Sequence, residues 1–115
     1  MKMKVLVIEP VKAPFVKEID SSLESMQKVV GGYIQALFPF EDPVALVCNE
    51  EGKLLGLPLN RALRDEDGNV YDIISGTFFL CSAPPNEETF SSLSDDQIER
   101  YTKLFEHPEL FLREG

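Results

Sequence analysis

Two guanidinium groups and an amide lie close together near the middle of this chain, at Asn60, Arg61 and Arg64. An Arg side chain can grip a carboxylate or a phosphate with two parallel hydrogen bonds. The cluster follows an otherwise apolar passage, and a glycine-containing turn at residues 50–52 precedes that passage, directly after Asn49. We therefore predict a binding site formed by Asn49, Asn60, Arg61 and Arg64.

The same cluster also has a structural interpretation, which the local sequence favours. Asn60 would cap a short helical turn within residues 57–63. The two arginines would pair with acids on the neighbouring turns, of which the sequence offers Asp65, Asp67 and Asp72. Exposed ion pairs of this kind are common and contribute little to stability. The binding interpretation stays open beside it.

The chain is acidic, with twenty Asp and Glu residues against eleven Lys and Arg residues and a formal charge of −9. That charge repels phosphates, so we expect no direct contact with nucleic acid or with an anionic membrane. The last predicted helix carries an acidic face that includes Asp95, Asp96 and Glu99. Such a face is usually only solvated, but it could also imitate DNA and occupy a DNA-binding protein.

No familiar catalytic or metal-binding pattern is present in the sequence. The run at residues 65–68 has carboxylates beside a glycine, but its register does not fit a calcium loop, because Ile74 falls where the last acidic ligand belongs. The two cysteines, Cys48 and Cys81, lie in apolar stretches and read as buried free thiols, and His107 is the single histidine. We predict no catalytic residue, no metal and no cofactor.

The pattern of apolar residues predicts one α+β domain over residues 1–115, with a mostly antiparallel sheet covered by two helices. The predicted strands span residues 4–9, 33–38, 44–49, 53–55 and 70–82, the last either a strand pair or one strand bent at Ser75 and Gly76. The first helix has Ser21 as its cap, an apolar face at residues 19, 23, 26 and 30, and a stop at residues 31–32.

The second predicted helix spans about residues 94–106 and completes the domain. Ser94 and Gln97 form a capping box at its start, and its apolar face comprises Ile98, Tyr101, Leu104 and Phe105. Residues 110–112 are expected to fold back onto the core, so that the whole segment 86–115 packs on the domain. No apolar run approaches the roughly 20 residues of a membrane helix, and the start does not resemble a signal peptide. A cytoplasmic location is the resulting expectation.

Three stretches of the chain resemble an uncharacterised family of small domains from Firmicutes and their conjugative elements and phages, catalogued as a domain of unknown function. They are residues 23–34 (LESMQKVVGGYI), 48–63 (CNEEGKLLGLPLNRAL) and 72–80 (DIISGTFFL). The ending Phe105-x-x-Pro108-Glu109-x-Phe111 is similar to that of members from gut Firmicutes. The resemblance implies an accessory protein of a mobile element, and it supplies no activity or catalytic residue.

These observations favour a non-enzymatic module that binds an unknown protein partner, with Asn49, Asn60, Arg61 and Arg64 as the first surface to test. Two alternatives remain open from the sequence. The chain could be an acidic DNA mimic that blocks restriction enzymes, as small acidic proteins of mobile elements do by analogy. It could instead bind a small ligand, or act as an enzyme, through an anion site near Arg61.

Overall fold

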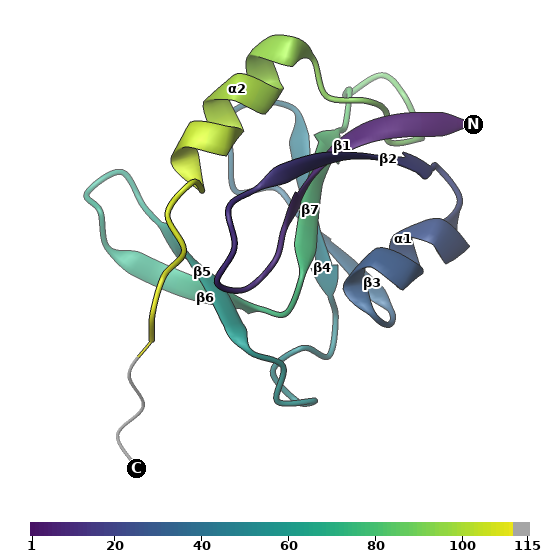
Figure 1. Ribbon diagram of the computed structural model, residues 1–115. Helices are drawn as coiled ribbons and strands as arrows, with labels where there is room; N and C mark the ends of the chain where they lie inside the picture. The colour runs from purple at the N-terminus through teal and green to yellow at the C-terminus, as the bar shows by residue number, and fades with distance from the viewer. Residues whose placement is uncertain (112–115) are drawn as a thin grey trace.

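The computed structural model describes residues 1–111, which form a five-stranded antiparallel sheet, a separate two-stranded hairpin and two helices (Figure 1). The sheet has the strand order β2-β1-β7-β4-β3, and β5 pairs with β6 in the hairpin. The elements are β1 (Lys2–Ile8), β2 (Phe15–Asp20), α1 (Leu23–Val30), β3 (Ile34–Leu37), β4 (Val44–Asn49), β5 (Leu59–Arg64), β6 (Val70–Ser75), β7 (Phe78–Ser82) and α2 (Asp95–Leu104). The predicted α+β class with a mostly antiparallel sheet is confirmed.

The five-stranded sheet is the middle layer, and it buries apolar side chains on both faces. Successive residues of a strand point to opposite faces, so an uninterrupted apolar strand feeds two cores. On one side lie Leu6, Leu46, Leu80 and Phe78, which pack with residues of the hairpin and α2. On the other side lie Val5, Val7, Val47 and Phe79, which pack with α1. The two helices therefore cover opposite faces of the sheet (Figure 1).

The region before α1 differs from the prediction. Residues 15–20 form an edge strand, β2, which pairs with β1 from Lys2 opposite Asp20 to Val7 opposite Phe15. Four of the six residues in β2 are exposed, so the strand has none of the apolar alternation that would reveal it. The helix cap is Ser22 rather than Ser21, and Gly31 ends the helix in the left-handed region, as predicted.

The region between β4 and β6 also differs from the prediction. Instead of a short strand at 53–55 and a loop with a helical turn at 57–63, residues 50–56 form turns and β5 runs from Leu59 to Arg64. This strand has polar residues at buried positions, so its sequence lacks the apolar pattern from which a strand is predicted. The predicted turn at 65–69 is present and joins β5 to β6.

The predicted break at Ser75 and Gly76 is confirmed, and it sends the chain from one sheet to the other. β6 ends at Ser75, Gly76 has φ +82°, and β7 then enters the middle of the five-stranded sheet. The positive φ favours glycine, and a Cβ atom on Gly76 would also lie 2.7 Å from a methyl group of Leu57, which would have to move. The hairpin consequently lies over one face of the sheet, at left in Figure 1.

The second helix begins at the predicted capping box of Ser94 and Gln97. Tyr101 and Phe105 are buried, as expected, but Leu104 is 61% exposed and does not share their face. Leu110 is exposed as well, against the expectation that 110–112 folds onto the core, and position 112 lies outside the described residues. Of the helices in residues 1–111, neither is long and apolar enough to cross a membrane.

Candidate functional site

The structure separates the four residues that the sequence grouped together. Asn60 and Arg61 are buried in β5, whereas Arg64 stands at the exposed end of the same strand. Asn49 ends β4 and lines a different, smaller cavity of about 150 Å³. Its amide donates to the carbonyl of Val30, and its oxygen accepts the backbone N–H of Glu51.

Asn60 joins β5 to the two neighbouring segments of the chain. Its side-chain nitrogen donates to the carbonyl oxygens of Ile8, at 2.8 Å, and of Gly76, at 2.9 Å. Its side-chain oxygen accepts a hydrogen bond of 2.8 Å from Nη1 of Arg61. The side chain is fully buried, so these bonds satisfy groups that water cannot reach. Asn60 lies within a strand and does not cap a helical turn.

Arg61 is a buried cation that binds backbone carbonyls. Nε and Nη2 donate to the carbonyl oxygen of Phe105, at 3.2 and 3.0 Å, and Nη2 also donates to that of Lys12 at 2.6 Å. Phe105 caps α2, where carbonyl groups carry a partial negative charge. Burial lowers the pKa of the guanidinium, and the charge of Glu109 opposes that shift. Arg61 therefore fastens the β1–β2 loop and the end of α2 to β5.

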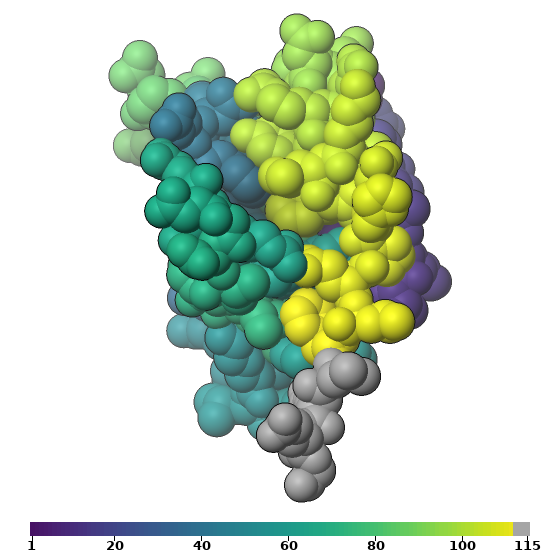
Figure 2. All heavy atoms as spheres, turned by 90° about the vertical axis from the view of Figure 1, so that its left-hand side faces the viewer, coloured from purple at the N-terminus to yellow at the C-terminus, as the bar shows by residue number. Residues whose placement is uncertain are grey.

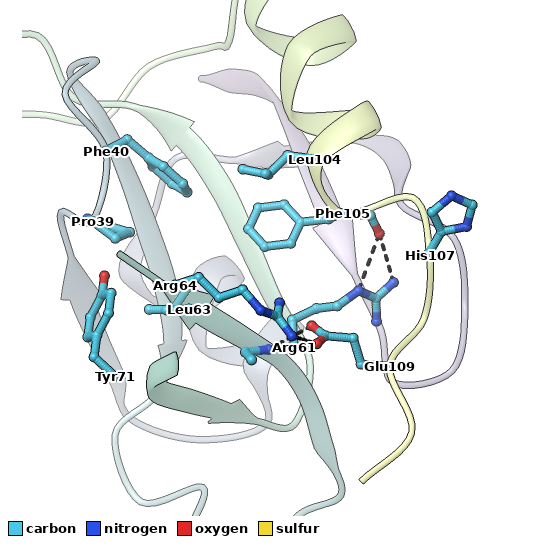
Figure 3. Close-up of a pocket in the computed structure, with 11 residues that line it drawn as sticks. Pro39, Phe40, Arg61, Leu63, Arg64, Tyr71, Leu104, Phe105, His107 and Glu109 are labelled. Carbon is cyan, nitrogen blue, oxygen red and sulfur yellow. Dashed lines mark hydrogen bonds and ion pairs between the residues drawn. The ribbon is translucent and has the colours of Figure 1, made fainter. Parts of the chain in front are cut away.

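A strap, residues 105–111, follows α2 and crosses the edge of β5 that faces away from β6. Oε2 of Glu109 accepts the backbone N–H of Ala62 at 2.8 Å, and Oε1 accepts from Nη2 of Arg64 at 2.6 Å (Figure 3). Burial raises the pKa of this carboxyl, but the bonds from Arg64 and Ala62 and the two arginine charges outweigh it, so the pKa is lowered. The partner of Arg64 is therefore on the strap rather than on the neighbouring turns.

A groove of about 340 Å³ lies between the hairpin on one side and α2 with the strap on the other. Figure 2 shows this hollow between the teal hairpin and the yellow helix and strap. Its lining is mainly apolar and aromatic, with the two arginines and Glu109 on its floor: Pro39, Phe40, Arg61, Ala62, Leu63, Arg64, Tyr71, Leu104, Phe105, His107 and Glu109.

Aromatic packing fixes the shape of the groove. The ring of Phe40 lies 4.7 Å from that of Tyr101 and 6.3 Å from that of Phe105, between centroids. The hydroxyl of Tyr101 donates to Asp42, and Arg100 forms an ion pair with the same carboxylate at 2.8 Å. These contacts hold α2 against the turn before β4, so the wall of the groove is built from rigid elements.

Two apolar side chains at the rim of the groove are open to solvent. Tyr71 of β6 is 57% exposed and Leu104 of α2 is 61% exposed, and they stand on opposite walls (Figure 3). The sequence analysis missed both as site residues. Leu104 has the helical spacing of a core residue, and nothing in the sequence shows that the hairpin faces α2. Only the exposed fraction of each side chain in the folded structure identifies Tyr71 and Leu104 as site residues.

The predicted acidic face lies on the exposed side of α2 and has mixed charge. Asp95, Asp96 and Glu99 are all exposed. Glu99 forms an ion pair of 3.6 Å with Lys103, one helical turn along. Arg100 is exposed between these residues. The first half of α2 therefore carries the carboxylates, and the cations Arg100 and Lys103 follow them in its second half.

The two cysteines lie away from the groove. Burial raises the pKa of the Cys48 thiol to about 11 and that of Cys81 to about 12, so both are protonated and poorly nucleophilic at neutral pH. Within residues 1–111, no three His, Cys, Asp or Glu side chains converge as metal ligands.

Comparison with known proteins gives one match. No curated protein and no solved structure matches the chain. The model of a family described as a domain of unknown function, DUF3846, matches residues 3–106, which include all of the strands and helices except the first residue of β1, and most of the groove lining. The chain therefore belongs to the DUF3846 family.

Proposed function

We propose that this domain is a non-enzymatic protein-interaction module that holds a segment of a protein partner in the groove between the hairpin and α2. The observation that carries the proposal is the pair of exposed apolar side chains, Tyr71 and Leu104, on opposite walls of a groove whose lining is mainly apolar and aromatic. Aromatic and Arg side chains at a concave, mostly apolar surface are typical of the centres of protein interfaces. An apolar side chain of a partner would fill the space between these two walls.

The polar contacts of the groove support this proposal over an anion-binding or catalytic site. Arg61 already donates to carbonyls of Phe105 and Lys12, and Arg64 is paired with Glu109. A small-molecule site needs polar groups that converge on the ligand. Here both guanidinium groups bind other groups of the chain itself, so the surface that the groove presents to a ligand is mainly apolar.

The wider setting of the proposal comes from composition and from the resemblance. The resemblance to proteins of conjugative elements and phages supports a partner encoded by the same mobile element. The free thiols Cys48 and Cys81 are typical of a reducing compartment, which supports a cytoplasmic site of action. The cations Arg100 and Lys103 lie beside the carboxylates of α2, and Lys103 pairs with Glu99, so the DNA-mimic alternative gains no specific support from this helix.

The proposal can be tested by affinity capture from the organism that encodes the chain, with a variant that removes the rim. Tyr71→Ala with Leu104→Ala should weaken binding of the captured partner at least tenfold, because each exposed ring or side chain contributes buried area at the centre of the interface. A matched control is Tyr33→Ala with Leu54→Ala, which removes similar side chains that are 65% and 87% exposed outside the groove.

The control variant should bind the purified partner with unchanged affinity in calorimetry. All four side chains are exposed, so both variants should retain their thermal stability. Equal affinity of the rim variant and the wild type for every captured protein would disprove the groove as the binding surface.

A further inference from the structure

The groove continues into a shallow depression with an acidic rim. Pro39, Arg64 and Tyr71 line both hollows, so the two share a wall. The depression adds four exposed carboxylates from the turn before β4 and from the β5–β6 turn, which we call the acidic ledge: Glu41, Asp65, Glu66 and Asp67. Any segment that fills the groove along the direction of the hairpin passes these carboxylates.

The charge of the acidic ledge is not balanced by its surroundings. Arg64 is the cation in the lining of the depression, and it is already paired with Glu109 of the strap at 2.6 Å. Asp65 accepts the backbone N–H groups of Asp67 and Asn69, which shape the turn without cancelling its charge. Within residues 1–111, none of the four carboxylates forms an ion pair.

We infer that the partner segment is basic: an apolar side chain enters the groove between Tyr71 and Leu104, and a neighbouring Lys or Arg reaches the acidic ledge. The inference rests on the proposed function and names the chemistry of its partner. Opposite charges across an interface set orientation and speed association, and like charges reject wrong partners. An acidic segment would meet four carboxylates at the mouth of the groove.

A long basic side chain fits the acidic ledge better than a metal ion does. A bound divalent cation needs ligand atoms that converge on one point, at 2.0–2.6 Å for magnesium or calcium. The acidic ledge is open, and no metal-binding group of its residues is found in the described chain. Lys and Arg carry their charge on flexible apolar stems, and so they can lie along the groove and still reach an exposed carboxylate.

The test is a selection of random 12-residue peptides displayed on phage against the immobilised full chain. The enriched peptides should carry Phe, Leu, Ile or Trp within a few positions of Lys or Arg. One selected peptide is then synthesised with a fluorescent label and titrated with four forms of the chain: the wild type, two charge variants, and the rim variant Tyr71→Ala with Leu104→Ala. Wild type should bind it tightest, with an affinity that falls steeply as salt is raised.

The first variant is Glu41→Gln, Glu66→Gln and Asp67→Asn together, which spares Asp65 because that carboxylate holds the turn. Binding should weaken about tenfold and become less dependent on salt. The second variant is Asp95→Asn, Asp96→Asn and Glu99→Gln, which removes the same charge from α2, outside both hollows. Its affinity should stay within about twofold of the wild-type value, because exposed charges beyond a Debye length are screened.

Three results would overturn the inference, and they differ in what they say of the groove. Selected peptides that lack Lys and Arg, but whose binding requires Tyr71 and Leu104, would support the proposed function and contradict the inference that the partner segment is basic. Equal losses in the two charge variants would show that net charge, and not the acidic ledge, attracts the peptide. Peptides that bind equally well after Tyr71→Ala and Leu104→Ala would contradict the proposed function itself.

Discussion

The five-stranded sheet and the β5–β6 hairpin are stabilised in different ways. In the sheet, all six residues of β4 and the first four of β7 are buried, and the apolar side chains pack on both faces. The hairpin contributes only Ala62, Leu63 and Ile74 to the buried apolar residues. Its other buried side chains are polar. Asn60 and Arg61 donate to the backbone carbonyls of Ile8, Gly76, Lys12 and Phe105, whereas the hydroxyl of Ser75 has no hydrogen-bond partner within the described residues.

This difference decides how the groove is positioned. Apolar packing is non-directional and tolerates small shifts, whereas a buried hydrogen bond requires its partner at a set distance and angle. Asn60 and Arg61 place the hairpin against Ile8, Gly76 and Phe105, and the hairpin and α2 are the two walls of the groove. These two residues, which we call the polar joint, therefore set the position of one wall of the groove relative to the other, and Arg61 itself also lines the groove.

Replacement of Arg61 by Met should have the largest effect on this joint. The substitution leaves the carbonyl of Phe105 and the side-chain oxygen of Asn60 without their donor at buried positions, and it also removes the part-buried bond to the carbonyl of Lys12. We expect a loss of about 3–5 kcal/mol in the free energy of unfolding. Urea denaturation followed by circular dichroism measures it.

Arg64→Met is the matched control for that experiment. Arg64 is half exposed and has one ion pair, so its removal should cost about 1 kcal/mol or less. Similar losses for the two variants would mean that the buried polar contacts do not hold the hairpin, and that apolar packing is sufficient for both regions.

Asn60→Ala should have the next largest effect. Two buried carbonyls, of Ile8 and Gly76, lose their donor, and Nη1 of Arg61 loses its side-chain acceptor. The expected loss in unfolding free energy is about 2–3 kcal/mol. Asn69→Ala, at an exposed position of the β5–β6 turn, should change it by less than about 0.5 kcal/mol. A loss for Asn60→Ala as small as that for Asn69→Ala would show that Asn60, although buried, does not stabilise the attachment of the hairpin to the sheet.

The same division explains which parts of the fold the sequence predicts. Strands β1 and β4 contain the uninterrupted apolar runs 5–8 and 44–48, and the capping box at Ser94 and the glycine stop at Gly31 are local signals, so these features are predicted closely. Strand β2 is exposed and β5 contains buried polar residues, so neither shows an apolar pattern. Their strand structure depends on partners distant in the sequence, which a local pattern does not contain.

The candidate site follows the same rule. Asn60 and Arg61 attract attention as a polar cluster in an apolar passage, and the structure explains their setting through carbonyls up to 52 positions away in the sequence. The groove itself is formed by segments from three parts of the chain, around Phe40, Tyr71 and Leu104. Only the topology brings these segments together, so the rim could not be predicted from spacing.

Glu109→Gln should have a smaller effect that depends on pH. The folded pKa of Glu109 is lowered, so the carboxylate stabilises the fold fully above its ordinary pKa of about 4.3 and loses that contribution as pH falls through the folded value. At pH 7 the variant should be less stable by about 1 kcal/mol. The difference between wild type and variant should shrink as the pH is lowered from neutral to below the ordinary pKa of a glutamate carboxyl. A difference that stayed constant over this range would show that the ion pair with Arg64 contributes nothing.

The smallest effect is expected at the β1–β2 loop, which presents the carbonyl of Lys12 to Arg61. Val11 has φ 56°, and it is the one non-glycine residue of the described chain in the left-handed region. A β-branched residue is strained there, whereas glycine is not. Val11→Gly should therefore stabilise the protein by about 0.5–1 kcal/mol, in spite of the greater freedom that glycine has in the unfolded chain.

A series at this position separates backbone strain from the loss of an exposed apolar side chain. Val11 is 64% exposed, so little packing is lost in any variant. The expected order of thermal stability is Gly above Asn, and Asn above Ala, because Asn tolerates a positive φ better than Ala does. If Ala gave the full gain of Gly, removal of the exposed valine would be the cause. If Gly alone gave the gain in stability, backbone strain at Val11 would be the cause. The carbonyl of Lys12 that Arg61 binds would then be held in place by a strained turn of the β1–β2 loop.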